Sequence, residues 1–152
     1  MLPHAKSFRD LVVYQKAVAL EQEIFRLSKA LPLDERYALT DQMRRAVRSI
    51  GAQIAEAWAR RRYPAHFASK LSDADAEQME TQHWVGSAVR AGYWTHDEAG
   101  ALLSSLDEVG RMLGSMIRNA DQFCGTSSKL HEESATYFCH TPTDHRSLVT
   151  GH

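Results

Sequence analysis

The chain has 152 residues, of which 43% are hydrophobic and 24% charged, and its formal net charge is −1. This length suits one domain with its own core, and the near-neutral charge argues against a generally cationic nucleic-acid-binding protein. The charge is uneven, because residues 42–62 hold six Arg and one Glu, whereas residues 73–80 hold four carboxylates and no cation. Patches of opposite sign suit contact between helices or between copies of the chain.

No apolar run approaches the ~20 residues that a membrane-spanning helix needs, and no cationic start precedes such a run. We therefore expect a cytoplasmic protein that binds no membrane. Cys124 and Cys139 lie near or beyond the end of the last helical pattern, which is not typical of a disulfide framework. We expect both to be reduced.

Apolar residues recur every three or four positions, which predicts four helices over residues 8–30, 34–62, 64–91 and 95–124. Asp34 is the expected cap of the second helix, and Gly92 the expected C-cap of the third. Thr95 and Glu98 form a capping-box pattern that opens the fourth.

Short connections between long helices force neighbours to be antiparallel. The predicted fold is therefore all-α, an antiparallel up-down-up-down four-helix bundle over residues 1–124. Residues 125–152 are polar and lack a period, which predicts a flexible C-terminal tail, with Tyr137-Phe138 as a segment that could dock on the bundle.

The second predicted helix has two distinct faces. Its core stripe consists of Leu39, Met43, Ala46, Ile50, Ile54 and Ala57. The opposite face, which we predict to be an oligomer interface, carries Arg44, Arg48, Ala52, Ala55 and Ala59. An exposed helix normally presents Lys and Glu outward, so a second copy of the chain is expected to cover these small residues. With Arg45, these arginines could pair with a neighbour's carboxylates, such as Asp73, Asp75 or Glu77.

The candidate nucleic-acid-binding residues are Arg60, Arg61 and Arg62, at the end of the same helix, where cations are favourable. Their guanidinium groups could hold the phosphates of RNA or DNA. No aromatic stacking platform or base-reading motif is recognised beside them, so the expected binding has low sequence specificity.

No motif in the sequence indicates catalysis, because the chain has no nucleophile elbow and no glycine-rich phosphate loop. Glu80 and His83 have the Glu-x-x-His spacing of di-iron bundles, but no second such motif is present. A metal-binding ferritin-like bundle stays open as the alternative function. The His and Cys residues of the tail match no zinc module: His131, Cys139, His140 and His145. We expect no metal, no cofactor and no catalytic residue.

Four glutamines fall on or beside the core stripes: Gln42, Gln53, Gln78 and Gln82. A buried unpaired amide costs ~1 to 3 kcal/mol, so we expect a hydrogen-bonded network that fixes helix register. Ser49 and Glu56 are the expected partners. A small polar pocket is the alternative.

The chain resembles the small four-helix-bundle proteins encoded in intervening sequences of bacterial 23S ribosomal RNA genes. The resemblance covers residues 8–124 and rests on the second-helix segment, on FRDLVVYQKA at 8–17, PLDE at 32–35, YALT at 37–40 and METQ at 79–82. Where that family usually reads Ser-Ile-Pro-x-Asn-Ile-Ala-Glu-Gly, this chain has Gly51, Gln53 and Ala57 in place of the Pro, Asn and last Gly.

The resemblance implies a homo-oligomeric ring, a pentamer, with no known catalytic activity. A related branch, the accessory variability determinants of diversity-generating retroelements, forms similar rings that bind nucleic acid and a reverse transcriptase. We therefore expect a non-enzymatic oligomeric scaffold or adaptor that binds RNA or DNA through Arg-rich surfaces.

Overall fold

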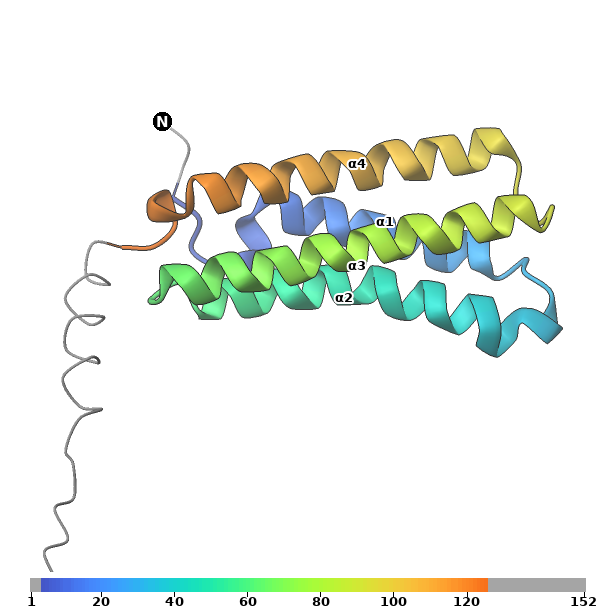
Figure 1. Ribbon diagram of the computed structural model, residues 1–152, viewed down its shortest axis with the longest axis horizontal. Helices are drawn as coiled ribbons and strands as arrows, with labels where there is room; N and C mark the ends of the chain where they lie inside the picture. The colour runs from blue at the N-terminus through green and yellow to red at the C-terminus, as the bar shows by residue number, and fades with distance from the viewer. Residues whose placement is uncertain (1–3, 126–152) are drawn as a thin grey trace, which may run out of the picture.

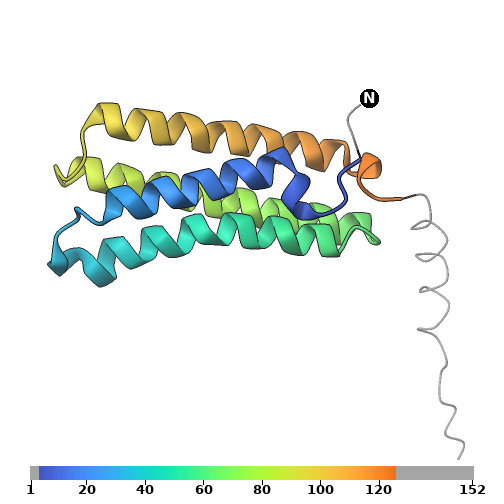
Figure 2. The same cartoon turned by 180° about the vertical axis from the view of Figure 1, so that it is seen from behind.

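The computed structural model describes residues 4–125, which form helices and the turns between them. The four long helices are α1 Val12–Ser28, α2 Asp41–Ala59, α3 Pro64–Arg90 and α4 His96–Arg118. They lie side by side, and successive connections are at alternate ends of the bundle, so consecutive helices run antiparallel (Figure 1, Figure 2). The predicted all-α four-helix fold is confirmed. The expectations for residues 126–152, including Tyr137-Phe138, lie outside the described residues.

The core lies along the common axis of the four helices. Each helix contributes an inward stripe, as the sequence period requires. The largest fully buried side chains include Ile24, Met43, Ile50, Ile54, Phe67, Leu71, Leu106 and Leu113. Burying each of these contributes about 1.5 to 3 kcal/mol, so the core stripes account for most of the stability of the bundle.

The predicted start of the first helix at residue 8 is wrong, because a separate turn and an extended residue precede α1. Ser7 and Asp10 form a capping box around a separate 3-10 turn, Phe8–Asp10. The Asp10 carboxylate accepts the backbone N–H groups of Lys6 and Ser7 at 2.8 and 3.0 Å. Leu11 then adopts an extended conformation with ψ 126, and α1 begins after it.

The second predicted helix is also wrong at both ends. Asp34 does not cap α2, because a 3-10 turn, Leu33–Glu35, and a π-helical turn, Arg36–Thr40, precede it. At the other end α2 stops at Ala59 instead of continuing to Arg62. The following Pro64 explains this end, because the residue before a proline avoids the helical region and Tyr63 is extended at φ −124, ψ 99.

The predicted end of the fourth helix at 124 is wrong, because α4 stops at Arg118 and a separate 3-10 turn, Ala120–Gln122, follows. The predicted end of the third helix and the start of the fourth are confirmed. Gly92, after α3, has φ 80, a conformation that glycine adopts without steric cost. At the start of α4 the Thr95 hydroxyl accepts the Glu98 N–H at 3.3 Å, and the Glu98 carboxylate accepts the Thr95 N–H at 3.0 Å. This pair forms the predicted capping box.

Candidate oligomer and nucleic-acid interfaces

The outer face of α2 lies on the surface of the bundle, where the sequence places it. Ala52 and Ala59 are exposed and Ala55 is half-buried. A shallow hollow of about 470 Å³ lies on this face and is lined by Asp41, Arg44, Arg45, Arg48, Ser49 and Ala52. The small side chains leave room for another backbone to approach closely.

Arg44 and Arg48 lean from this face onto α1. Their guanidinium carbons lie 4.7 and 5.7 Å from the centre of the Phe25 ring, which is 38% exposed. The Arg44 Nε donates to the Ser28 Oγ at 2.8 Å, and the Arg48 Nε lies 3.7 Å from a Glu21 oxygen. The sequence interpretation missed Phe25, which lies off the apolar stripe of α1 and extends the candidate interface beyond α2.

Arg45 is used within its own chain. Its Nη2 donates to the Glu80 Oε1 at 2.7 Å, and its Nη1 lies 3.8 Å from the Glu77 Oε1. The expected pairing of this arginine with a neighbouring copy is therefore corrected, since carboxylates of α3 in the same chain take its charge. The Trp84 Nε1 also donates to the Glu80 Oε1, at 3.2 Å. This cluster joins α2 to α3.

Glu77 and Glu80, one helical turn apart on α3, have opposite electrostatic environments. Burial alone would raise the pKa of Glu80, but the hydrogen bonds from Arg45 and Trp84 outweigh it and leave that pKa below its usual value. Burial raises the pKa of Glu77, and Arg45 offsets this only in part. The Glu77 Oε2 is buried without a hydrogen-bond partner among the described residues.

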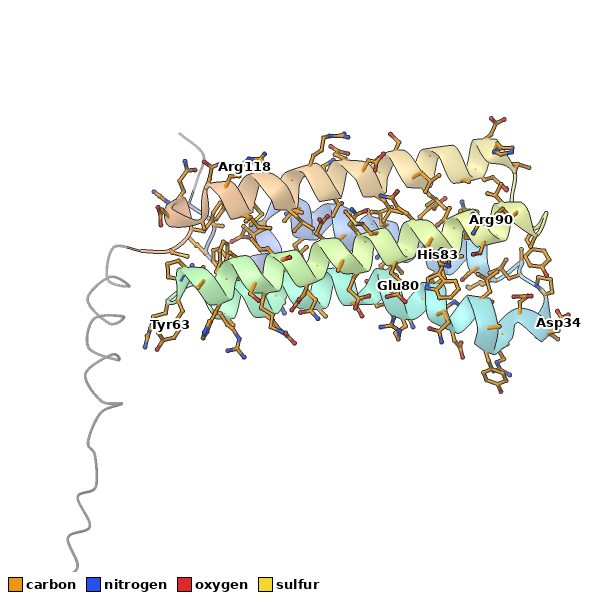
Figure 3. All side chains as sticks on the ribbon, viewed as in Figure 1. Asp34, Tyr63, Glu80, His83, Arg90 and Arg118 are labelled. Atoms are coloured by element: carbon orange, nitrogen blue, oxygen red, sulfur yellow. The ribbon has the colours of Figure 1, made fainter. Side chains whose placement is uncertain are left out.

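The Glu-x-x-His motif does not converge on a common point. Glu80 faces Arg45 and Trp84, and the His83 ring lies edge-on to the Trp84 ring at 4.9 Å between centres. Figure 3 labels Glu80 and His83 on α3. Within residues 4–125, no three His, Cys, Asp or Glu side chains gather as metal ligands would. No described helix is long and apolar enough to cross a membrane.

A polar layer joins α3 to α4. Gln78 is 3% exposed and donates to the Asp75 Oδ1 at 3.0 Å, while Gln82 donates to both the Gln78 Oε1 and the Asp107 Oδ1. The expected hydrogen-bonded network is present at these two glutamines, but its partners are different. Asp75 and Asp107 supply the carboxylates.

The residues expected to complete that network lie elsewhere. Ser49 donates to the backbone oxygen of Arg45, and Glu56 forms an ion pair with Lys70 at 2.9 Å. Gln53 accepts from the same Lys70 at 3.4 Å. Gln53 and Glu56 therefore contact α3 at Lys70, which precedes Gln78 on the same helix, and Ser49 lines the hollow on the outer face of α2.

The three consecutive arginines form the turn between α2 and α3. We call residues 60–63 the arginine turn. Arg60 and Arg62 are exposed, and Arg61 is half-buried. The Arg61 guanidinium carbon lies 3.5 Å from the centre of the Trp58 ring, and its Nε donates to the Trp58 backbone oxygen at 2.9 Å. Arg61 therefore caps the carbonyl end of α2, while Arg60 and Arg62 remain at the surface.

Aromatic rings accompany these cations, contrary to the sequence interpretation. Besides Trp58, the ring of Tyr63 lies 5.5 Å from that of His66 and is tilted by 46°. Tyr63 is 38% exposed and lies at the end of the bundle where α2 meets α3 (Figure 3). Trp58 lies three residues before Arg61, a spacing that places both side chains on one side of a helix, so the sequence itself contained the signal for this contact.

The comparisons with known proteins agree with this architecture. The 23S rRNA-intervening sequence protein family matches residues 9–115. A crystal structure of a protein with unknown function from the S23 ribosomal protein family of Bacteroides thetaiotaomicron is 30% identical, with a TM-score of 0.63 over 70% of this chain and 98% of that chain. None of the curated proteins compared with this chain matches it. Because the family match spans well over half of its residues, the chain belongs to the 23S rRNA-intervening sequence protein family.

Proposed function

We propose that the protein is a non-enzymatic homo-oligomeric scaffold or adaptor whose subunits meet through the outer face of α2. The observation that carries the proposal is the shallow hollow on that face, where Ala52 lies beside the cations Arg44 and Arg48. Small side chains permit close approach of a second helix, and Arg44, which makes no ion pair within residues 4–125, can bind a carboxylate of the partner. A closed ring of five subunits is the assembly that family resemblance favours.

The refinement of this proposal is that the assembly binds RNA or DNA through the arginine turn. One subunit offers few phosphate contacts, since Arg61 is partly engaged with Trp58. A ring repeats Arg60 and Arg62 in every subunit, so several weak contacts act on one strand at a high effective concentration. The assembled ring can therefore bind a polyanion such as RNA or DNA, although each chain has a net charge of −1.

Light scattering after size exclusion tests the assembly. The unmodified protein should have the mass of an oligomer, and Ala55→Arg should reduce that mass because a long cation at a half-buried position blocks the approach of a partner. Ser104→Arg, at an exposed position on α4, is the matched control and should leave the mass unchanged. Circular dichroism should report equal helix content for all three. A monomeric unmodified protein contradicts the proposal.

Titration of labelled RNA at two salt concentrations tests the refinement. Arg60→Ala/Arg62→Ala should bind more weakly, and the logarithm of its affinity should fall less steeply with the logarithm of salt, by about 0.7 to 0.9 for each lost phosphate contact. Arg36→Ala/Arg90→Ala removes two exposed arginines from the opposite end and is the control. Equal binding by both double variants contradicts a role for the arginine turn.

A further inference from the structure

We infer that the arginine turn binds single-stranded nucleic acid, with unpaired bases stacking on Tyr63 and on the Arg61 guanidinium while Arg60 and Arg62 hold the phosphates. This inference rests on the proposed nucleic-acid function and adds to it the class of ligand. It depends on three consecutive cations, residues 60–62, that the aromatic residues Trp58 and Tyr63 flank.

The first stacking element is the pair Trp58 and Arg61. The guanidinium lies over the indole at 3.5 Å, and the hydrogen bond from its Nε to the Trp58 backbone oxygen fixes its orientation. Within residues 4–125 the two terminal nitrogens of Arg61 make no hydrogen bond or ion pair. The Trp58 ring thus holds the guanidinium from one side, and guanidinium planes stack with bases in complexes with unpaired nucleic acid.

The second stacking element is Tyr63, which follows the three arginines directly. Its backbone begins α3, where it accepts the Phe67 N–H at 2.9 Å, so its position is fixed by the helix start. Its side chain is 38% exposed, and its ring contacts the exposed His66. A tyrosine at the tip of a bundle, supported from one side by a second ring, is a platform of the kind on which bases stack.

The charge at this end matches a phosphate backbone. Neither Arg60 nor Arg62 makes an ion pair in the part of the chain that the structure describes. Lys70 differs, because its ammonium already lies 2.9 Å from Glu56 and 3.7 Å from Asp73. The exposed Arg118, at the end of α4, lies at the same end of the bundle (Figure 3).

The aromatic rings favour unpaired over paired nucleic acid. The bases of a duplex are stacked on one another and are not available to the aromatic rings of this turn, so a duplex can use only the arginines. An acidic peptide would likewise use only the cations. A single strand can use both sets of groups, and each stacked base is worth about 5- to 150-fold in affinity.

Fluorescence anisotropy with labelled 12-nucleotide single strands of RNA and DNA, and with the DNA duplex of the same sequence, tests the inference at low salt. Both single strands should bind more tightly than the duplex, because stacking and phosphate contacts are common to RNA and DNA. Tyr63→Leu should weaken single-strand binding by about fivefold or more and leave duplex binding unchanged. Tyr63→Phe should keep the unmodified affinity, since it keeps the ring.

Tyr37→Leu is the matched control, because Tyr37 is an exposed tyrosine beside an arginine at the opposite end of α2. It should have no effect on binding. Tryptophan emission supplies a second readout, since single strand should quench it in the unmodified protein and much less in Trp58→Phe. Melting temperatures should show that every variant is folded.

The outcomes separate the two levels of the proposal. Equal affinity for strand and duplex, with no loss in Tyr63→Leu, overturns the stacking inference and leaves nucleic-acid binding in place. Polyglutamate that competes as well as oligonucleotide, again without an effect of Tyr63→Leu, overturns it in favour of an acidic protein partner. Absence of binding to strand and duplex at low salt overturns both the inference and the nucleic-acid function.

Discussion

The side-chain nitrogen of Gln78 occupies the space above Gly110, so that a Cβ at position 110 would lie 2.8 Å from it. The same Cβ would lie 3.3 Å from the Asp75 Oδ1, which accepts the Gln78 hydrogen bond. The polar layer between α3 and α4 therefore depends on a glycine in the middle of α4. This relationship makes Gly110 a packing residue and not a flexible point.

Gly110→Ala should destabilise the protein even though alanine is the better helix former. The helix preference gains ~1 kcal/mol, but displacing a buried amide from its hydrogen bonds costs about 1 to 3 kcal/mol, so the net loss is on the order of 1 kcal/mol. Gly100→Ala, also on α4, has open space around the new Cβ and should stabilise by about 0.5 to 1 kcal/mol. Urea unfolding measures both.

The double variant Gln78→Ala/Gly110→Ala identifies the cause. With the amide removed, the Gly110→Ala step should become neutral or stabilising, because the nearest group is gone and the Asp75 Oδ1, at 3.3 Å, is no longer tied to Gln78 and can move slightly. A loss of equal size in both backgrounds would mean that another contact of Gly110 is responsible.

Neutralising two glutamates one turn apart should have opposite effects on stability. At pH 7, Glu80→Gln should lower the melting temperature, because it removes the negative charge that pairs with Arg45 and leaves only a neutral amide oxygen to accept from Arg45 and Trp84. Glu77→Gln should leave the melting temperature unchanged or raise it, because burial disfavours the Glu77 charge and its Oε2 lacks a partner among the described residues. Each change should be less than about 1 kcal/mol, since solvent screens this partly exposed cluster.

The pH dependence follows from the sign of each pKa shift. The folded state lowers the pKa of Glu80, so its stabilising contribution is present above the usual value of 4.5 and is lost as pH falls through the lower folded-state value. The folded state raises the pKa of Glu77, so its destabilising effect is present above that raised value and disappears below 4.5. Melting temperatures of the two variants should therefore converge with that of the unmodified protein in acid.

Thr95→Ala should cost about 1 kcal/mol and lower the melting temperature by a few degrees. The hydroxyl of Thr95 satisfies the Glu98 N–H, which has no partner inside the first turn of α4. Thr95→Ser keeps the hydroxyl and should behave like the unmodified protein. Equal melting temperatures for all three proteins would show that water replaces the cap without loss.

The fold was predictable from sequence because each core stripe follows a single helix, and a period of three and four residues can be read locally. The turn after α3 and the start of α4 were predictable because Gly92 and Thr95 are local signals, whereas the equally local capping box of Ser7 and Asp10 was overlooked. The early end of α2 depends on how Tyr63 and Pro64 turn the chain. The three arginines that follow α2 favoured a longer helix, but the chain turns before Pro64 and the helix ends at Ala59.

The candidate sites were harder to predict because their partners lie on other helices. Arg45 lies 35 positions before Glu80, and only the packing of α2 on α3 brings the two together. Phe25 lies off the apolar stripe of its own helix, so its contact with Arg44 also required the fold. The Trp58 and Arg61 pair is local, but an interpretation based on charge alone overlooked the ring.

If copies of the chain meet on the outer face of α2, the melting temperature of the protein should depend on protein concentration. Association stabilises the folded state by mass action, so dilution should lower the melting temperature of an assembly but not that of a monomer. Ala52→Arg places a long charged side chain on this exposed face and should remove most of that dependence while keeping the helix content. Ser104→Arg on α4 adds the same charge elsewhere and should retain the dependence. The melting temperature of the unmodified protein could instead stay constant over a hundredfold dilution. That result would show that association does not stabilise the bundle and would contradict the proposed α2 contact.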